Sequence, residues 1–278
     1  MFKRTMPRKL YLLIALLGAT LFALLPTTFA LAATHATPSL IGVKSHYLAL
    51  GDSLAFGFQP DLDFAHGYST DFSQNLKQHG STDYDNMGCP GETAATMISG
   101  KCPYPELRKF PYIGSQLTAA EDYLRILSGQ VSPVTLDIGA NDLLPDINST
   151  TCTISPNWSS DLAKVDANLT QTILPGLSAA LTVNGKRTGD LLLMNYYDPY
   201  QNKCPSSVPY IQQINQHLAT DAQGYATVVD VFDAFGGTAS PNPNTCNYTW
   251  ICSPFHDIHS TTTGYSTIAT AFERTTGY

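Results

Sequence analysis

Beyond residue 33 the sequence contains no apolar run long enough to span a bilayer. It also contains no internal repeat, no low-complexity tract and no Pro/Gly/Ser-rich linker. Nothing therefore divides this part of the chain, and we expect a single domain over residues 40–278 with no stable membrane span. A chain of this length can bury the core of one large α/β domain.

The long apolar run of the sequence lies at its N-terminus. Basic residues within 3–9 precede an apolar stretch over residues 10–25, and Ala30-Leu31-Ala32 supplies the small-x-small pattern that signal peptidase requires. This arrangement predicts a signal peptide over residues 1–32 and hence a secreted, extracytoplasmic protein. The alternative is an uncleaved membrane anchor, for which the run is somewhat short.

Positive charge is scarce in the remainder of the chain. Residues 33–278 keep 11 of the 15 Lys and Arg residues but all 22 Asp and Glu residues, which gives a formal net charge of −11. Such a surface repels nucleic acids and anionic lipid headgroups. We therefore expect no nucleic-acid partner, and we expect the chain to be a monomer.

Metal-binding patterns are missing as well, because the sequence has no CxxC pair and no HExxH and its seven histidines are scattered. We expect no metal and no cofactor. All six cysteines follow the predicted cleavage site, and an even number in an exported chain favours disulfides. Sequence alone leaves the pairing open, and we predict that neighbours pair, as Cys89–Cys102, Cys152–Cys204 and Cys246–Cys252.

Short β-branched runs alternate with longer amphipathic stretches along the chain. Strands are expected at His46–Leu50, Asp83–Asn86, Val134–Ile138, Leu191–Asn195 and Ala226–Val231. Helices are expected at Tyr68–His79, Ser115–Leu127, Ser160–Leu181, Val208–Ala222 and Thr262–Thr275, with Pro175 breaking the third. This alternation predicts a parallel sheet covered by helices on both faces, with ligands binding at the carboxyl ends of the strands.

Polar residues do follow the predicted strands. Gly51-Asp52-Ser53-Leu54 comes after the first strand, where a serine at a strand-to-helix turn can project its hydroxyl into the crevice. The alternative is that Asp52 or Ser53 only caps the following helix. Gly91 comes after the second strand, where its backbone N–H can approach a reacting oxygen, or where it can simply form a tight turn.

Two further segments carry candidate site residues. Asn141, after the third strand, can point its amide at a developing oxyanion, or it can stabilise a local turn. His259, near the C-terminus, has Asp257 close by and can act as an oriented general base. The alternative for this pair is a solvated His/Asp loop.

Together these four segments, which spread over residues 47–265, resemble the four blocks of the GDSL, or SGNH, hydrolase family. The serine, glycine, asparagine and histidine occur in the family's order, and Tyr196-Tyr197-Asp198-Pro199 also resembles its secreted bacterial members. Ser53 does not lie in the GxSxG motif of α/β-hydrolases, which favours this assignment. The resemblance implies a three-layer α/β/α sandwich, flavodoxin-like, with a central parallel sheet of about five strands.

The resemblance also implies roles for the residues. Ser53 would be the nucleophile of an esterase or lipase, and His259 would act first as base and then as acid. The Ser53 N–H, the Gly91 N–H and the Asn141 side chain would form the oxyanion hole. The substrate would be a small-molecule or lipid carboxylic ester. Two alternatives remain: an acyltransferase on the same scaffold, or a catalytically inactive ester- or glycan-binding module, which would be expected to have lost one of these residues.

The catalytic acid departs from the family pattern. The family usually has an acid three residues before its histidine, but position 256 is His and Asp257 lies only two residues before His259. We predict that Asp257 orients His259. The alternatives are a main-chain carbonyl within residues 252–256, and His256 as the base, which the spacing to Gly264-Tyr265 disfavours.

Overall fold

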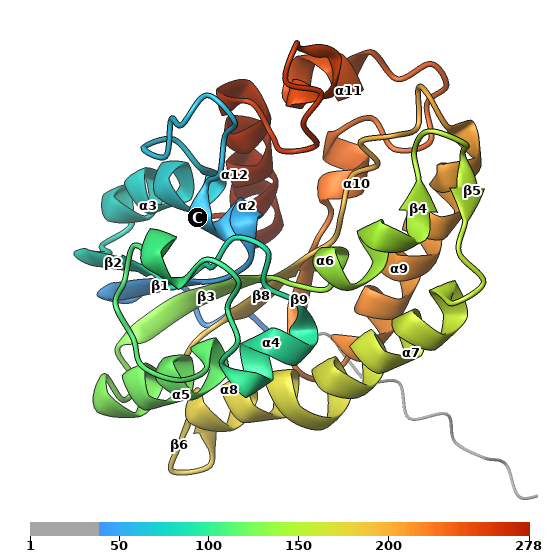
Figure 1. Cartoon of the computed structure of the whole chain (residues 1–278). Helices are drawn as coiled ribbons and strands as arrows, with labels where there is room; N and C mark the ends of the chain where they lie inside the picture. Colours follow the sequence, from blue (N-terminus) through green and yellow to red (C-terminus); the bar gives the residue numbers. More distant parts are fainter. Residues whose placement is uncertain (1–38) are drawn as a thin grey trace, which may run out of the picture. The chain divides into compact units, whose positions relative to one another are not determined.

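A five-stranded parallel sheet forms the centre of the computed structural model, which describes residues 39–278 (Figure 1). The strand order is β2-β1-β3-β8-β9, and all four pairings are parallel. The strands are β1 (His46–Gly51), β2 (Asp83–Asn86), β3 (Val131–Asp137), β8 (Leu191–Met194) and β9 (Thr227–Val229). The predicted signal peptide lies outside the described residues.

The character of each strand follows from its place in the sheet. Every residue of β3 and β8 is buried, as expected for central strands that helices cover on both faces. The edge strand β2 has the polar sequence Asp-Tyr-Asp-Asn and is only partly buried. All five strands overlap the predicted ones, and β3 begins three residues earlier than expected.

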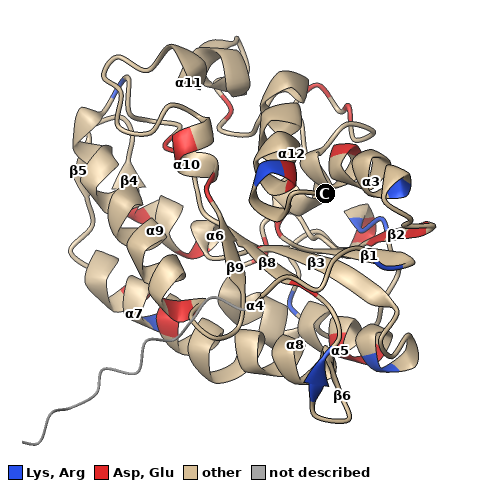
Figure 2. Ribbon diagram, turned by 180° about the vertical axis from the view of Figure 1, so that it is seen from behind, with Lys and Arg blue, Asp and Glu red and all other residues tan. Residues whose placement is uncertain are grey.

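Helices form a layer on each side of the sheet, which confirms the expected three-layer α/β/α sandwich (Figures 1 and 2). One layer consists of α3 (Tyr68–Gln78) and α12 (Thr262–Thr276), which lie side by side. The other contains α5 (Gln116–Ile126), α7 (Trp158–Asn168), α8 (Leu174–Ala180) and α9 (Val208–Asp221). Each turns an apolar stripe to the sheet, as Phe72 and Leu76 of α3 illustrate.

The prediction that Pro175 breaks the third helix was wrong, because the chain remains helical on both sides of this proline. Helix α7 continues through one π-helical turn, η3 (Leu169–Ile173), into α8. Pro175 lies in the first turn of α8, where its missing N–H matters least. The hydrogen-bonding pattern changes just before the proline, but the chain stays helical.

Short helices, 3₁₀ turns and two hairpins lie between the strands and the long helices. They are too short to show a periodic pattern in the sequence. The short helices are α2 (Ser53–Phe56), α4 (Ala94–Ser99), α6 (Ala140–Leu143), α10 (Val231–Ala234) and α11 (Pro243–Tyr248). The 3₁₀ turns are η1 (Pro105–Leu107), η2 (Leu144–Asp146), η4 (Pro205–Ser207) and η5 (Trp250–Cys252). Two hairpins pair β4 (Ile147–Asn148) with β5 (Thr153–Ile154), and β6 (Thr182–Val183) with β7 (Lys186–Arg187).

The cysteines are joined in three neighbouring pairs: Cys89–Cys102, Cys152–Cys204 and Cys246–Cys252. Basic residues are few and dispersed, on α3, α5, α7, α12 and the β6–β7 hairpin among other places (Figure 2). Within residues 39–278, no helix is both long enough and apolar enough to cross a membrane.

Candidate active site

Ser53, His259 and Asp257 come together at the carboxyl end of β1. The Ser53 Oγ atom lies 2.8 Å from His259 Nε2. On the other side of the imidazole ring, His259 Nδ1 lies 2.6 Å from Asp257 Oδ1. Ser53 is the first residue of α2, and only 7% of its surface is exposed. The three side chains therefore form a continuous chain of hydrogen-bond contacts from a hydroxyl to a carboxylate.

A tight turn lets Asp257 reach His259 despite the short spacing. The Asp257 Oδ1 atom also accepts the backbone N–H of His259 at 2.8 Å, so one carboxylate oxygen contacts both the main chain and the ring. Burial opposes the charge of Asp257, but hydrogen bonding and the charge of His259 outweigh it and lower the pKa of this carboxyl below its ordinary value. The side chain of His256 lies instead near the carbonyl of Ile251, at 3.3 Å from Nδ1.

The segment that carries His259 is anchored on both sides. The Trp250 N–H donates to the His259 carbonyl at 3.0 Å, and the Tyr197 hydroxyl donates to the Ile258 carbonyl at 2.9 Å. The Phe58 ring lies 4.7 Å from the imidazole, centroid to centroid. The Cys246–Cys252 bridge closes the segment that contains Trp250. Sequence reasoning missed these contacts, because none of them belongs to a local pattern.

Asp52 and Asp137 hold the turn before Ser53. Asp52 caps α2 by accepting the N–H of Leu54 at 2.9 Å, so the capping alternative is true of Asp52. Asp137, at the end of β3, accepts the N–H groups of Asp52 and Ala55, both at 3.2 Å. Burial and the neighbouring Asp52 raise the pKa of Asp137 well above its usual range. Gly51 is required here, because a Cβ atom would lie 2.2 Å from the Asp137 carbonyl oxygen.

Two backbone N–H groups in the described part of the chain, those of Ser53 and Gly91, are unpaired. Among residues 39–278, no acceptor pairs with the N–H of Ser53, at the start of α2, or with the N–H of Gly91. Gly91 lies in a turn closed by the Glu92 N–H and the Cys89 carbonyl, with a φ of +78° that favours glycine. These are the two main-chain groups that the sequence assigned to an oxyanion hole.

The amide of Asn141 connects the two turns. Its Nδ2 atom donates to the Glu92 carbonyl at 2.9 Å and to Asp52 Oδ2 at 3.2 Å. Because an amide nitrogen carries two hydrogens, both are engaged here. The bond to Asp52 is the longer of the two.

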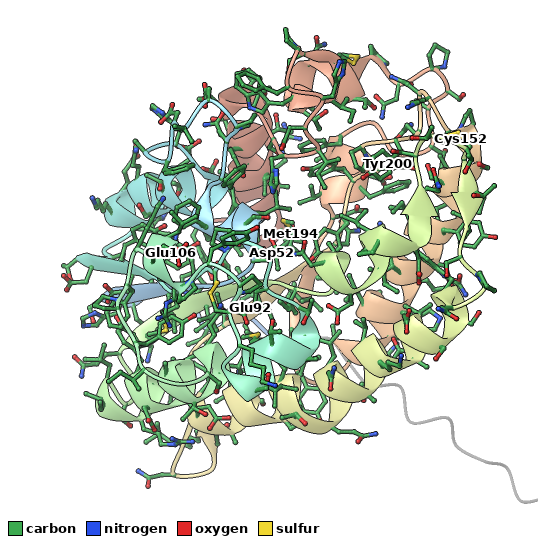
Figure 3. All side chains as sticks on the ribbon, in the orientation of Figure 1. Asp52, Glu92, Glu106, Cys152, Met194 and Tyr200 are labelled. Carbon is green, nitrogen blue, oxygen red and sulfur yellow. A yellow bond between two sulfur atoms is a disulfide. The ribbon has the colours of Figure 1, made fainter. Side chains whose placement is uncertain are left out.

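Glu92 and Gln116 form a second buried network beside the site. Figure 3 shows Glu92 close to Asp52 at the centre of the molecule, with Met194 at the end of β8 nearby. Gln116 donates to Glu92 Oε2 at 3.1 Å. Burial raises the pKa of Glu92 to about 7, and the charge of Asp52 adds to that effect. Neither Glu92 nor Gln116 was singled out from the sequence.

A cavity of about 640 Å³, its open mouth included, adjoins the serine. Asp52, Ser53, Asn141 and His259 line one end of it. The remaining wall comes from α2, α6, η2, β4, the start of α7, the segment after β8, α9 and the segment before α12. Its residues are Leu54, Ala140, Leu143, Leu144, Ile147, Trp158, Tyr196, Tyr197, Pro199, Ile211, Ile214 and Ile258. Most of this wall is apolar.

One group of potential metal ligands occurs among the described residues, formed by Cys89, Glu92 and Cys102. The two sulfur atoms are bonded to each other, so neither is a thiolate that can bind a metal.

Residues 49–266 match the GDSL-like Lipase/Acylhydrolase family, and the chain belongs to this family. The expected resemblance is thereby confirmed. No curated protein matches the sequence.

Solved structures of esterases and lipases share the fold. The acetylxylan esterase Axe2 from Geobacillus stearothermophilus has a TM-score of 0.56 and 18% identity, covering 86% of this chain and 97% of that one. The lipase Lip_vut3 from a goat rumen metagenome has a TM-score of 0.54 and 14% identity, covering 83% and 96%. An extracellular lipase from Streptomyces rimosus has a TM-score of 0.53 and 18% identity, covering 83% and 99%.

Proposed function

We propose that this protein hydrolyses carboxylic esters through an acyl-enzyme on Ser53. The observation that carries the proposal is the contact chain from Ser53 Oγ through His259 to Asp257. The unpaired backbone N–H groups of Ser53 and Gly91 support it. A nucleophile, an oriented base and preorganised oxyanion donors are the components that acyl transfer requires.

In the first half-reaction, His259 Nε2 takes the proton of Ser53 as Oγ bonds to the carbonyl carbon of the ester. The carbonyl oxygen becomes an oxyanion that the N–H groups of Ser53 and Gly91 stabilise, with Asn141 as a third donor. When the ester bond breaks, His259 returns the proton to the leaving alcohol. Water then attacks the acyl-enzyme, and His259 again serves as base and then as acid.

Asp257 holds the tautomer in which Nδ1 carries the hydrogen, so that Nε2 can accept the serine proton. Its lowered pKa supports this role, because a carboxylate that stays charged stabilises the imidazolium formed during attack. The 2.6 Å contact to Nδ1 favours Asp257 over the alternatives of a main-chain carbonyl or a different base.

The test combines labelling with turnover. Wild-type protein should react with a fluorophosphonate at Ser53 and hydrolyse p-nitrophenyl butyrate, and the Ser53→Ala variant should do neither while keeping its thermal stability. Loss of a catalytic serine costs on the order of 10⁶ in turnover. A purified variant that kept a tenth of the activity would exclude Ser53 as nucleophile. Assays with a competing alcohol acceptor distinguish a hydrolase from an acyltransferase.

We also propose that the protein works outside the cytoplasm. Three disulfides among residues 39–278 support an oxidising compartment, since such bridges are rare in cytosolic proteins. The N-terminal sequence pattern supports the same location. Detecting the protein in the culture medium, with an N-terminus at residue 33, would test this.

A further inference from the structure

We propose that the cavity beside Ser53 binds an unbranched, medium-length apolar acyl chain, such as an octanoyl group, and that Trp158 limits the length accepted. This inference rests on the proposed function and specifies its substrate class. It separates two kinds of substrate that the fold neighbours' names suggest, acetylated sugars and lipids.

The distribution of polar groups along the cavity is the first argument. The charged and amide side chains in the lining, those of Asp52, Asn141 and His259, lie at the end that holds Ser53. Beyond that end, the wall is made of aliphatic and aromatic carbon. The Tyr197 hydroxyl is already used, since it donates to the Ile258 carbonyl. The hydroxyl of Tyr196, which also lines the cavity, is buried without a hydrogen-bond partner. Apart from this hydroxyl, a group that enters the cavity meets polar side chains only where the ester itself would lie.

This wall does not suit a sugar. A buried hydroxyl without a hydrogen-bond partner costs free energy, and each sugar carries several. The lining contains no Lys or Arg, so an acyl chain that ended in a carboxylate or phosphate would leave its charge uncompensated. A neutral hydrocarbon chain meets neither penalty.

The extent of the cavity argues against an acetyl group as its intended occupant. The far wall, with Ile147, Trp158 and Ile214, comes from β4, α7 and α9, which lie beyond α6 as seen from α2 in Figure 1. A methyl group next to Ser53 would leave this far wall without contacts. Each methylene that the wall buries should raise kcat/KM about fourfold, the equivalent of the usual transfer free energy per methylene.

Trp158 is fixed in place as part of that far wall. Its Nε1 donates to Gln213 Oε1 at 2.8 Å, and its ring packs edge-on against Tyr210, with centroids 5.2 Å apart. It begins α7, and α6 lies between α7 and α2 in Figure 1. Only 4% of its surface is exposed. A side chain held by both an α9 hydrogen bond and a ring contact does not move aside easily, so it sets a limit to the chain.

The experiment compares p-nitrophenyl acetate, butyrate, octanoate and palmitate, which share one leaving group. We expect kcat/KM to rise at least tenfold from acetate to octanoate and to fall again for palmitate. Equal rates, or a preference for acetate, would overturn the inference. A parallel series of alkyl acetates varies the alcohol instead, and selectivity that followed the alcohol length would also overturn it.

Two variants locate the effect. Trp158→Ala should shift the optimum toward palmitate, with Trp158→Phe as a milder replacement if the alanine variant does not fold. Ile214→Trp should fill the cavity and lower the octanoate-to-acetate ratio at least tenfold. The control is Ile268→Phe, in the fully buried part of α12, which should lower stability and leave that ratio unchanged. Variants that leave the ratio unchanged would refute the assignment to this cavity.

Binding measurements separate this inference from the proposed mechanism. Octanamide should bind the Ser53→Ala variant at least tenfold more tightly than acetamide, and Ile214→Trp should remove the difference. This result would support the acyl site even if fluorophosphonate failed to label Ser53. Labelling of Ser53 and hydrolysis of acetate without any octanamide binding would leave the proposed function intact and refute the chain-binding site.

Discussion

One side-chain amide, that of Gln116, bonds to both backbone groups of Gly51. The Gly51 N–H donates to Gln116 Oε1 at 2.7 Å, and Gln116 Nε2 donates to the Gly51 carbonyl at 2.9 Å. The same Nε2 donates to Glu92 at 3.1 Å. Gln116, from the start of α5, thus joins Gly51, two residues before Ser53, to Glu92, the residue after Gly91.

Replacing Gln116 should therefore disturb the position of Ser53 relative to Gly91. In Gln116→Leu, the Gly51 N–H loses the Gln116 acceptor, whereas the Gly51 carbonyl still accepts the Cys89 N–H. The loss of a partner for a buried group costs about 1–3 kcal/mol of stability. We expect a lower melting temperature and about a tenfold fall in kcat with little change in KM. Gln116→Glu, which can still accept the Gly51 N–H, should recover part of the activity as the pH falls and the new carboxyl gains a proton.

The exposed Gln130 provides the control. Gln130→Leu touches no part of the site, so it should change neither the melting temperature nor kcat. If Gln116→Leu lost stability but kept full kcat at low temperature, Gln116 would have a structural role alone.

Ser53 could be predicted as a site residue from the sequence, whereas Gln116 could not. Ser53, Asn141 and His259 each lie in a short segment whose residue types and position after a strand, or late in the chain, indicated a role. Gln116 acts through a contact with a residue 65 positions away, and a glutamine near a helix start has no distinctive pattern. The central strand β8 was predictable because it is buried on both faces and its sequence is apolar throughout.

The behaviour of Pro175 was less predictable for a similar reason. A proline excludes one hydrogen bond, but whether a helix then ends or changes its turn depends on the surface it packs against. Leu174 and Leu177 are both buried, so continuing the helix keeps their contacts. The wall of the cavity was missed because it collects residues from eight separate segments.

Asn141 should matter for both rate and stability. Asn141→Ala removes one oxyanion donor, which should lower kcat by roughly 10²–10³ with a smaller change in KM. It also leaves the Glu92 carbonyl without its donor, so a modest fall in melting temperature should accompany it. Steady-state kinetics and thermal unfolding of the same sample measure the two effects. A change confined to KM would assign Asn141 to substrate binding instead.

Glu92 should make the protein less stable as the pH rises toward neutrality. Its pKa of about 7 in the folded state lies above the ordinary value of 4.5, so the folded state holds the proton more tightly than the unfolded chain does. Stability from this group therefore falls between about pH 4.5 and 7, by up to about 3 kcal/mol. Glu92→Gln should flatten that part of the curve, measured by urea unfolding at several pH values.

The exposed Glu106, which Figure 3 shows well away from Asp52, supplies the matched control. Glu106→Gln should leave the pH dependence of unfolding as it is in the wild type. An unchanged curve for Glu92→Gln would show that Glu92 ionises as it does in the unfolded chain.

The disulfides should separate stability from activity. The Cys246–Cys252 bridge closes a short loop next to the strand bridge between Thr249 and Ser260, which holds His259. The Cys152–Cys204 bridge closes a loop of 52 residues, so in the chain-entropy account it contributes more to stability. Replacing Cys246 and Cys252 by serine should lower kcat more than replacing Cys152 and Cys204 does. Replacing Cys152 and Cys204 should lower the melting temperature more. The reverse order would contradict this assignment.

Asp257→Asn should be the most informative substitution at the site. An asparagine oxygen can still accept the backbone N–H of His259, so the turn is kept while the charge is lost. Its amide hydrogens, however, favour the imidazole tautomer with the hydrogen on Nε2, which cannot accept the Ser53 proton. We expect a fall in kcat of about 10⁴ at neutral pH, the size known for the serine-protease triad. Because the pKa of Asp257 is lowered below its ordinary value, the wild-type carboxylate stays charged in the neutral range, so its own protonation should not shape the activity profile there. His256→Ala is the control and should keep nearly full activity, since its ring faces Ile251. A loss below tenfold in Asp257→Asn would mean that Ser53 and His259 work as a dyad which the main chain holds in place.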